Sequence, residues 1–391
     1  MAPRILLIEA VDYRGFPLGG QLTFAKNMVK AFGGRLALVG ISTDDTPVGK
    51  WIDKEFDSVK VPFFSFGRRR AASGRPLIPA RLSAFLDLRK HRKAILGLGI
   101  KRAMMLAPET ILSTVSWGWD RLCYVYASAD NPLTISRYPG AAVFAKVFEG
   151  MTFRAVSCAD LILAHADNSA IEALCARSRG KLPRDRIVQY PTRVDTEIFH
   201  LSPKEAARKA LSLDEKAAVV VTTGRIHWAK GYALLLDAFK LFLDRHPGSL
   251  LYFVGDGESR ADLQKRINGA GLSAHAFITG NESPQKVAAY LNAADLFTLA
   301  SYKEGWSTSM VEALCCGKPI VSTDVSSARE IVATGENGYV LADRDPHEFA
   351  AAMEKALGFG DLTAFATQGS QRYGLKFLER DLSALWEPLR R

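Results

Sequence analysis

Two glutamates separated by seven residues, Glu304 and Glu312, stand on either side of a predicted helix start in the segment 300–321. The Ser-Thr-Ser run at 307–309 can cap the first turn of that helix, and Gly317 marks its end. A helix N-terminus has unpaired N–H groups and a partial positive charge, which favour a bound phosphate. Carboxylates beside a phosphate can accept hydrogen bonds from sugar or ribose hydroxyls. The pattern therefore predicts a nucleotide-sugar site, although glutamates are also common near solvated helix starts.

Two cations, Arg225 and Lys230, lie five residues apart after a short apolar run that is typical of a strand. Cleavage of a sugar–phosphate bond leaves a nucleoside diphosphate that carries additional negative charge. Cations placed beside that bond stabilise the charge as it develops, without a metal ion. An Arg and a Lys near a helix start are otherwise ordinary surface residues, so their place in the fold decides between the two interpretations.

The second half of the chain alternates predicted strands and helices, which indicates a parallel sheet wrapped by helices. Ligands of such sheets bind beyond the carboxyl ends of the strands. Glycine-containing turns follow four of the strands, so we expect these turns to converge on one edge of the sheet. The turns are Gly224-Arg225, Gly255-Asp256-Gly257, Gly280-Asn281 and Glu304-Gly305, and the predicted strands are 218–223, 250–254, 276–279, 295–300, 319–322 and 339–341.

In the first half, a predicted strand at 4–9 precedes a loop with Gly19-Gly20 and a helix at 21–32. A glycine pair lets the backbone approach a ligand closely, or forms a plain turn. The spacing does not complete Gly-x-Gly-x-x-Gly, so a nicotinamide-dependent enzyme is not favoured. The other predicted elements are strands at 112–115, 122–126, 160–164 and 187–189, a helix near 168–176, and a basic segment at about 66–107 that is helical in its later part.

Length and composition are those of an ordinary globular protein. A chain of 391 residues with 48% hydrophobic and 24% charged residues is expected to form two domains. We find no run of eighteen apolar residues that would span a membrane, and the start of the chain has the pattern of a strand and not of a signal peptide. Five cysteines without Cys-x-x-Cys spacing indicate reduced thiols, so we expect a cytoplasmic protein.

Positive charge is concentrated in the first half of the chain. Residues 1–200 carry 29 Lys and Arg against 18 Asp and Glu, a net of +11, whereas residues 201–391 carry 22 against 23, a net of −1. Between Arg68 and Met105 the cations are mixed with apolar residues, which favours peripheral attachment to an anionic membrane. A solvated face that maintains solubility is the alternative. No zinc motif or aromatic-rich RNA module accompanies the charge, so a nucleic-acid partner is not expected.

The order of the motifs resembles that of the retaining glycosyltransferases of glycosyltransferase family 4, the glycosyl transferases group 1. The hallmark of that family is a Glu, seven residues, a second Glu, then Ala and Gly-x-Pro. This chain has Glu304, Glu312, Ala313 and Gly317-Lys318-Pro319 at those places. The resemblance covers residues 218–342 and includes Gly224-Arg225, Lys230-Gly231, Gly255-Asp256-Gly257, Glu330-Ile331-Val332 and Glu336-Asn337-Gly338-Tyr339.

The resemblance implies an α/β protein with the GT-B fold, in which two Rossmann-like domains face each other across a cleft. Residues 1–195 would form the N-terminal, acceptor-binding domain and residues 196–371 the C-terminal, nucleotide-sugar-binding domain. A final helix at about 372–391 would return to the first domain. The linker Pro191–Phe199 departs from the family's Pro-Asn-Gly-Val-Asp, since Thr192 and Arg193 replace the Asn and Gly.

The resemblance also implies roles for single residues. Arg225 and Lys230 would contact the donor diphosphate, Glu304 the hydroxyls of the transferred sugar, and Glu312 the ribose. The family's Phe-Gly after the first glutamate is replaced here by Trp306-Ser307. The expected donor-binding residues are Gly19, Gly20, Gly224, Arg225, Lys230, Gly255, Gly280, Asn281, Glu304, Trp306, Ser307, Thr308, Ser309 and Glu312.

A catalytic histidine that many family members have in the first domain is missing from the corresponding stretch, 124–132. Asp130 is the candidate for its role, although Asp130-Asn131-Pro132 also fits a plain turn. His165 and His227 are further candidates. The expected catalytic residues are therefore Arg225, Lys230, Glu304 and Asp130, with no metal site and no cofactor, since no Asp-x-Asp cluster lies in the predicted site.

These observations predict a glycosyltransferase (EC 2.4) that moves a sugar from a nucleoside-diphosphate-sugar to a saccharide or lipid-linked acceptor, in cell-envelope polysaccharide or glycolipid biosynthesis. A sugar-nucleotide epimerase or phosphorylase of the same fold is an alternative, and a polyanion- or membrane-binding protein without catalysis is an alternative of another class. For the transfer itself, attack on the face that the leaving group departs and double displacement through Glu304 both stay open.

Overall fold

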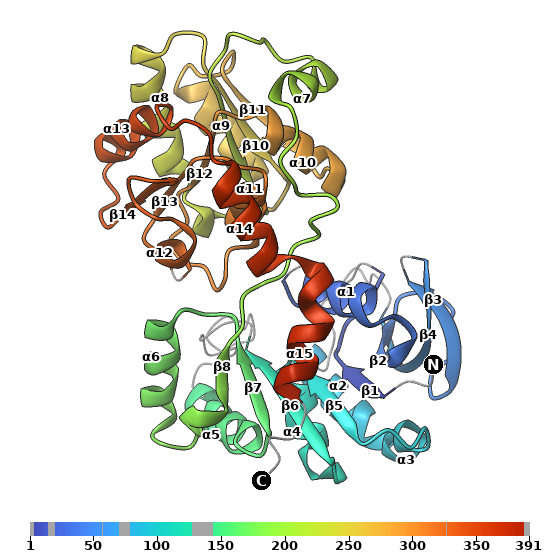
Figure 1. Ribbon diagram of the computed structural model, residues 1–391. Coiled ribbons are helices and arrows are strands. Elements are labelled where there is room, and N and C mark those ends of the chain that lie inside the picture. The colour runs from blue at the N-terminus through green and yellow to red at the C-terminus, as the bar shows by residue number, and fades with distance from the viewer. Residues whose placement is uncertain are drawn as a thin grey trace. The chain divides into compact units, whose positions relative to one another are not determined.

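The computed structural model describes residues 4–14, 20–56, 58–69, 79–126, 144–325 and 327–386 (Figure 1). The chain divides into two compact units. The first unit is Met1–Pro191 together with Leu378–Arg391, and the second is Thr192–Phe377. The chain therefore passes between the units twice, after Pro191 and after Phe377.

An eight-stranded sheet forms the centre of the described part of the first unit, in the order β3-β4-β2-β1-β5-β6-β7-β8. Neighbouring strands are parallel except β3 and β4, which pair as an antiparallel hairpin. The central strands consist of apolar residues that are buried throughout, as expected for parallel strands covered on both faces. The strands are β1 (Ile5–Ile8), β2 (Leu36–Ser42), β3 (Trp51–Phe56), β4 (Val59–Arg68), β5 (Arg102–Met105), β6 (Arg121–Tyr126), β7 (Leu161–Ala164) and β8 (Ile187–Gln189).

The helices of the first unit include one from the end of the chain. This helix, α15 (Leu378–Trp386), contacts α1 (Gly20–Phe32), and Arg35 forms an ion pair with Glu379. Leu382 and Trp386 of α15 are buried, so the helix is part of the core of this unit. The remaining helices are α2 (Ala80–Lys90), α3 (Arg92–Leu96), α4 (Pro108–Thr114), α5 (Ala145–Val156) and α6 (Asn168–Ser178).

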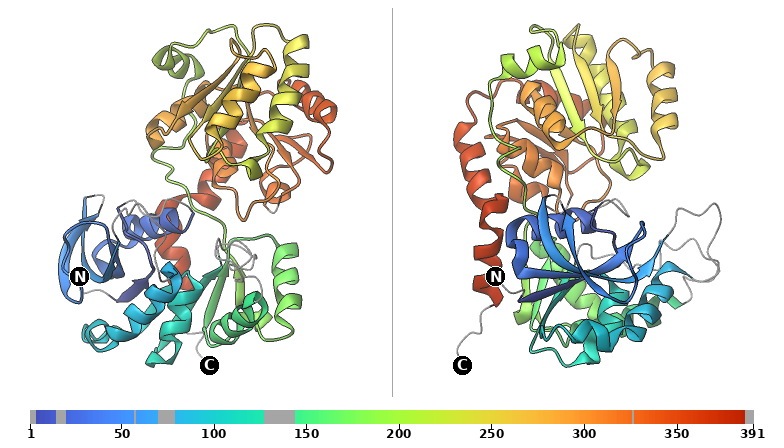
Figure 2. Two further views of the ribbon diagram at one scale, coloured as in Figure 1. Left: turned by 180° about the vertical axis from the view of Figure 1, so that it is seen from behind. Right: turned by 90° about the vertical axis from the view of Figure 1, so that its right-hand side faces the viewer.

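The second unit is built on a six-stranded parallel sheet in the order β11-β10-β9-β12-β13-β14, within the residues that the structure describes. Helices cover both faces of this sheet, and a separate apolar cluster fills each side (Figure 2). The strands are β9 (Val219–Thr223), β10 (Leu250–Val254), β11 (Ala276–Gly280), β12 (Leu296–Leu299), β13 (Ile320–Thr323) and β14 (Gly338–Leu341). The helices are α7 (Lys204–Leu211), α8 (Tyr232–Arg245), α9 (Arg260–Gly269), α10 (Pro284–Ala293), α11 (Thr308–Cys315), α12 (Ala328–Ile331), α13 (Pro346–Ala356) and α14 (Thr363–Tyr373).

The six strands predicted for the second unit are confirmed to within one residue at each end. In the first unit the strand predicted at 112–115 is wrong, because α4 runs to Thr114 and a 3-10 turn follows at Val115–Trp117. α4 begins with Pro108, a residue favoured at the first helical position. The strand of this region is β5, which lies inside the basic segment. The final helix does not start near residue 372, since extended backbone at Gly374 separates α14 from α15.

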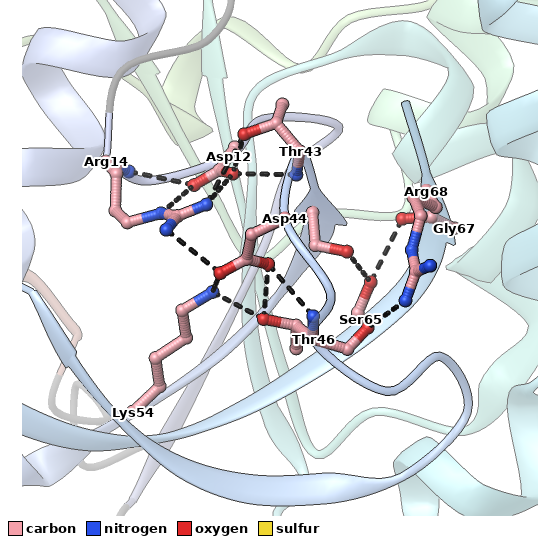
Figure 3. A network of polar contacts seen from close by, with 10 residues as sticks. Asp12, Arg14, Thr43, Asp44, Thr46, Lys54, Ser65, Gly67 and Arg68 are labelled. Carbon is pink, nitrogen blue, oxygen red and sulfur yellow. Dashed lines mark hydrogen bonds and ion pairs between the residues drawn. The ribbon is translucent and has the colours of Figure 1, made fainter. Parts of the chain in front are cut away.

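A polar network joins the loop after β1 to the loop after β2 (Figure 3). Arg14 forms ion pairs of 2.9 Å with both Asp12 and Asp44. Asp12 also accepts hydrogen bonds from the amide and hydroxyl of Thr43, at 2.9 and 2.7 Å, and Lys54 lies 3.1 Å from Asp44. Burial alone would raise the pKa of Asp12, but the bonds from Arg14 and Thr43 outweigh it and hold that pKa at about 2. The network therefore depends on ionised carboxylates.

Candidate active site

Four turns of the second unit meet at the carboxyl edge of its sheet, because the strands before them are parallel neighbours. β10 pairs with both β9 and β11, and β9 pairs with β12. The amide of Gly224 donates to the carbonyl of Val254 at 3.0 Å, and Gly255 forms a bridge with Gly280. The predicted convergence of these turns on one edge is confirmed.

Glycine is required at two points where these turns touch. Gly255 has φ +150°, and a Cβ there would lie 2.0 Å from the carbonyl oxygen of Gly224. Gly231 has φ +66°, and a Cβ there would lie 1.9 Å from the carbonyl oxygen of Ala300. A larger residue at either place would separate the backbones. The contact at Gly231 holds the turn that carries Lys230 against the end of β12.

Lys230 and Glu304 form the central ion pair of this edge. The Nζ atom of Lys230 lies 2.6 Å from Oε1 of Glu304, and the hydroxyl of Ser301 donates to the same oxygen at 2.6 Å. The Glu304 side chain is 13% exposed and that of Lys230 is 33% exposed. The carboxylate is thus fixed in place by two donors, while the lysine keeps part of its surface open to a ligand.

Arg225 has a carboxylate partner that the sequence analysis missed. Its guanidinium donates two hydrogen bonds to Glu258, Nε to Oε2 at 2.9 Å and Nη2 to Oε1 at 3.1 Å. Nε2 of His227 lies 3.5 Å from the same carboxylate. A backbone hydrogen bond and Arg225 both lower the pKa of Glu258. The signal that could have indicated this residue is its position directly after the Gly255-Asp256-Gly257 turn.

The N-terminus of α11 lies next to this edge and is capped as predicted. The hydroxyl of Ser307 accepts a hydrogen bond from the amide of Met310 at 3.4 Å. The amide of Ser307 donates to the hydroxyl of Ser327 at 3.0 Å and is therefore not available for a ligand. In the part of the chain that the structure describes, the amides of Thr308 and Ser309 donate to no acceptor, as expected for the first turn of a helix.

Glu312 lies one turn inside α11 and is partly buried. Its carboxyl group has no hydrogen-bond partner among the described residues, and burial raises its pKa to about 8. A carboxyl group without an internal partner is costly to bury in its charged form. The side chain can therefore accept hydrogen bonds from a ligand without first breaking bonds to the protein.

Residues 203–363 match the family model described as Glycosyl transferases group 1. This part of the chain is a group 1 glycosyltransferase domain. The D-inositol 3-phosphate glycosyltransferase of Jonesia denitrificans is 27% identical over 198 residues, which are 48% of this chain and 47% of that protein. The lipopolysaccharide core biosynthesis glycosyltransferase LpsE of Rhizobium meliloti is 30% identical over 165 residues, 42% of this chain and 47% of that protein. The chain thus spans about half the length of the curated relatives that it matches.

Solved structures resemble the chain over almost its whole length. Sucrose-phosphate synthase from Thermosynechococcus elongatus has a TM-score of 0.74 at 16% identity, with 98% of each chain covered. Anabaena HepE in complex with UDP and glucose has a TM-score of 0.71 at 17% identity, with 99% of this chain and 100% of that chain covered. The chain therefore has the GT-B fold of the α/β class.

Trp306 stands where the group 1 glycosyltransferases usually have phenylalanine, and it lies in the core. The side chain is 6% exposed, and its ring lies 6.1 Å from that of Tyr373 in α14. The structure thus brings together Arg225, Lys230, Glu304 and the α11 terminus at one edge of the sheet. The indole of Trp306 belongs instead to the apolar core of the second unit. Asn281, by contrast, is exposed after β11.

The expected residues of the first unit are placed only in part. Gly19 and Asp130 lie outside the described residues, and Gly20 is the first residue of α1. His165 follows β7 and is buried between the rings of Phe24 and Tyr190, and this burial lowers its pKa to about 4. At neutral pH His165 is therefore an uncharged side chain.

The thiols and metal-ligating residues of the described chain are dispersed. All five cysteines are free thiols, in agreement with the expectation of reduced cysteines. Burial raises the pKa of Cys315 to about 11, so this thiol is protonated at neutral pH. Within the described ranges, no group of three or more His, Cys, Asp or Glu side chains is placed to hold a metal ion.

Proposed function

We propose that this protein is a retaining glycosyltransferase that transfers a sugar from a nucleoside-diphosphate-sugar to a hydroxyl group of a saccharide or lipid-linked acceptor. The observation that carries the proposal is the Lys230–Glu304 ion pair, which lies beside Gly224 at the edge that also holds Arg225 and the α11 terminus. Anabaena HepE, which shares the fold, was solved with UDP and glucose and with UDP-glucose. The names of LpsE and of the lipopolysaccharide outer core galactosyltransferase WaaB support an acceptor of the cell envelope.

Arg225 and Lys230 would stabilise the departing diphosphate. Both side chains are already held by carboxylates, Glu258 and Glu304, so they are oriented before the donor arrives. Pre-oriented cations stabilise the charge that develops on the leaving group without reorganising during the reaction. This mechanism needs neither a metal ion nor a cofactor, because the two cations supply the charge that a metal would supply.

In the proposed transfer, the bond from the anomeric carbon to the diphosphate oxygen breaks and a bond from that carbon to the acceptor oxygen forms. The acceptor attacks on the face that the leaving group departs, which retains the configuration, and its proton passes to the diphosphate oxygen. Double displacement through Glu304 is less favoured, because one of its oxygens already accepts from Lys230 and Ser301. We therefore assign Glu304 the role of binding the transferred sugar's hydroxyls.

The rest of the donor would extend from the diphosphate over neighbouring elements. The amides of Thr308 and Ser309 point from the positive end of α11 and would bind a phosphate. Glu312 would accept hydrogen bonds from the ribose hydroxyls, and the base would lie near Gly280 and Asn281. The second unit would in this way bind the donor, and the first unit the acceptor.

We also propose that the first unit attaches the protein to the anionic inner face of the cell membrane. The described segment 79–102 carries seven Lys and Arg against one acidic residue, Asp87. On α2, Leu82 and Leu86 are one turn apart and 49% and 50% exposed, and the cations that follow them are exposed as well. Exposed apolar side chains among cations are typical of helices that lie on a membrane surface. Within the described residues, no helix combines the length and apolar character needed to cross a bilayer.

The activity can be tested by incubating the protein with labelled nucleotide-sugars of different bases and sugars and measuring the release of nucleoside diphosphate, with and without envelope saccharide acceptors. Arg225→Ala and Lys230→Ala should each lower turnover by about 10²-fold or more, since each removes a charge that stabilises the leaving group. Lys265→Ala, an exposed lysine on α9, is the matched control. Absence of turnover with every donor, or a need for manganese after chelation, would contradict the proposal.

A further inference from the structure

Two large aromatic side chains lie exposed side by side next to the Lys230–Glu304 ion pair. Trp228 is 63% exposed and Tyr302 is 50% exposed, and their ring centroids are 6.0 Å apart. Trp228 comes from the turn after β9, and Tyr302 comes from the turn after β12. Exposed aromatic side chains are unfavourable in water, and two in contact with each other indicate a surface that binds a ligand.

The pair is held by the backbone and by a cation. The amide of Tyr302 donates to the carbonyl of Ala229 at 2.8 Å, which joins the two turns. The guanidinium of Arg344 lies 4.3 Å from the centre of the Tyr302 ring and donates to the carbonyl of Ala300 at 3.3 Å. The ring of His227 lies 5.4 Å from that of Trp228. The two rings are therefore pre-oriented.

We propose that Trp228 and Tyr302 form a binding platform for a pyranose ring. The apolar face of a pyranose presents polarised C–H groups, which an aromatic face attracts through its negative quadrupole. The hydroxyls at the rim of the same sugar need charged or polar partners, and the neighbouring side chains of Lys230, Glu304 and Arg344 supply them. This proposal rests on the proposed function for its ligand class, because a glycosyltransferase must hold sugar rings at this edge.

A protein partner fits these surroundings less well. In the described part of the second unit, the other large apolar side chains with substantial exposure are Leu201 and Phe277. Leu201 lies against Gly317, directly after α11, and Phe277 of the edge strand β11 stacks on Tyr252 of β10. The platform is thus a pair of rings among charged groups, whereas the centre of a protein interface is depleted of charge.

The ring that stacks on the platform has two sources, the transferred sugar of the donor or a sugar of the acceptor. Emission from Trp228, obtained as the difference between the wild-type protein and Trp228→Phe, is measured with acrylamide as quencher. The donor arm compares UDP-glucose and GDP-mannose with UDP and GDP, and the acceptor arm uses maltotriose, chitotriose and lactose in the presence of UDP. Protection of Trp228 by a sugar-bearing probe, beyond that of the bare nucleotide, supports the proposal and identifies the source.

Affinity measurements on variants complete the test. For the sugar-bearing probe that protects, Trp228→Ala and Tyr302→Ala should each weaken binding by roughly 5- to 10-fold, the size of one aromatic contact, whereas Trp228→Phe keeps a ring and should stay within about 2-fold. Binding of the bare nucleotide should not change in any of them. Phe277→Ala, which removes an exposed aromatic from the same unit, should leave both affinities unchanged.

The proposal is overturned when no sugar-bearing probe protects Trp228, or when the bare nucleotide protects it equally. It also fails when Trp228→Ala binds the sugar-bearing probe as tightly as the wild-type protein. These results leave the proposed function standing if nucleotide-sugars are still turned over. Loss of turnover with every donor is the separate result that would remove the proposed function.

Discussion

Binding of the nucleotide-sugar should release a proton from Glu312. The carboxyl group of Glu312 has no hydrogen-bond partner among the described residues, and burial raises its pKa to about 8. The ribose hydroxyls that we expect to donate to this group stabilise its ionised form. The donor should therefore bind the ionised protein better, so that Glu312 loses its proton when the complex forms at neutral pH.

The size of the effect follows from the pKa. At pH 7, one unit below a pKa of about 8, roughly one molecule in ten carries an ionised Glu312. The observed affinity at pH 7 should then be about tenfold weaker than that of the ionised protein, which corresponds to about 1.4 kcal/mol. Each further unit below pH 7 should cost about another tenfold in affinity, until the protonated form itself binds the donor.

Isothermal titration between pH 6 and pH 8.5 measures this dependence directly. The nucleotide-sugar is the right ligand, since its esterified phosphates keep a constant charge over that range, whereas the terminal phosphate of a free nucleoside diphosphate titrates. Titrations in buffers of different ionisation enthalpy should show nearly one proton released at pH 7. Glu312→Gln keeps the shape of the side chain but cannot ionise, so its affinity should not vary with pH.

The same pKa predicts a change in stability, with a sign that differs from that of most carboxylates. The folded-state pKa of Glu312 is raised from 4.5 to about 8, so the folded protein binds the extra proton between these values. The contribution of Glu312 to the free energy of unfolding is therefore full below pH 4.5 and is lost as the pH rises through 8, by at most about 5 kcal/mol. Glu312→Gln should remove this slope in urea denaturation. An affinity of the wild-type protein that stays flat from pH 6 to pH 8.5, or a Glu312→Gln variant with the wild-type slope, would refute the reasoning.

Two further predictions concern the first unit. The pKa of Asp12 is lowered from 3.8 to about 2, so its ionic bonds stabilise the fold above pH 3.8 and lose that effect as the pH falls through 2; Asp12→Asn should cost about 2 kcal/mol at pH 7 in urea denaturation and almost nothing near pH 2. Vesicles of phosphatidylglycerol and phosphatidylcholine should sediment the wild-type protein at low salt, and Leu82→Ser with Leu86→Ser, or neutralisation of the four cations at 89–93, should each release it. Neutralising four exposed cations of the second unit is the matched control. Wild-type protein that stays in the supernatant at low salt would contradict the membrane proposal, since each cation near an anionic surface contributes about 1 kcal/mol.

The fold of the second unit was predictable because its local signals agree with one another. Four of its six strands are short apolar runs followed by a glycine-containing turn, and several of its helices begin with a capping residue or a proline. Ser283 caps α10, and Asp345 accepts from two amides at the start of α13. Where propensity, pattern and turn chemistry point to the same element, its boundaries can be derived from the sequence alone.

The first unit was harder to predict because its local signals conflict. β5 consists of Arg102–Met105 within a segment rich in cations, and its last three residues are buried on both faces, so it shows no alternation. The run at 112–115 has the apolar and β-branched residues of a strand. This run is nevertheless helical, because Pro108 and Glu109 favour a helix start and α4 packs against α2. Periodicity over four residues cannot separate these cases.

The residues of the site could be identified singly, but their pairing could not. Lys230 and Glu304 are 74 residues apart in the chain, and Arg225 and Glu258 are 33 apart. These pairs arise because parallel strands bring their carboxyl ends to one edge. The sequence predicts that convergence, but it does not specify which carboxylate reaches which cation, since this depends on the twist of the sheet and on the length of each turn.

The two tryptophans next to the site residues show that a motif does not predict whether a neighbouring side chain is buried or exposed. Trp306 and Trp228 both lie within four residues of Glu304 or Lys230, yet Trp306 is 6% exposed and Trp228 is 63% exposed. Trp306 is buried because α14, more than fifty residues later in the chain, places Tyr373 against it. Trp228 lies in a turn that Gly231 and Ala229 hold against the residues directly after β12, and its side chain is left exposed. A substitution at position 306 should therefore act on the stability of the second unit, whereas one at position 228 should act on the sugar that the enzyme accepts.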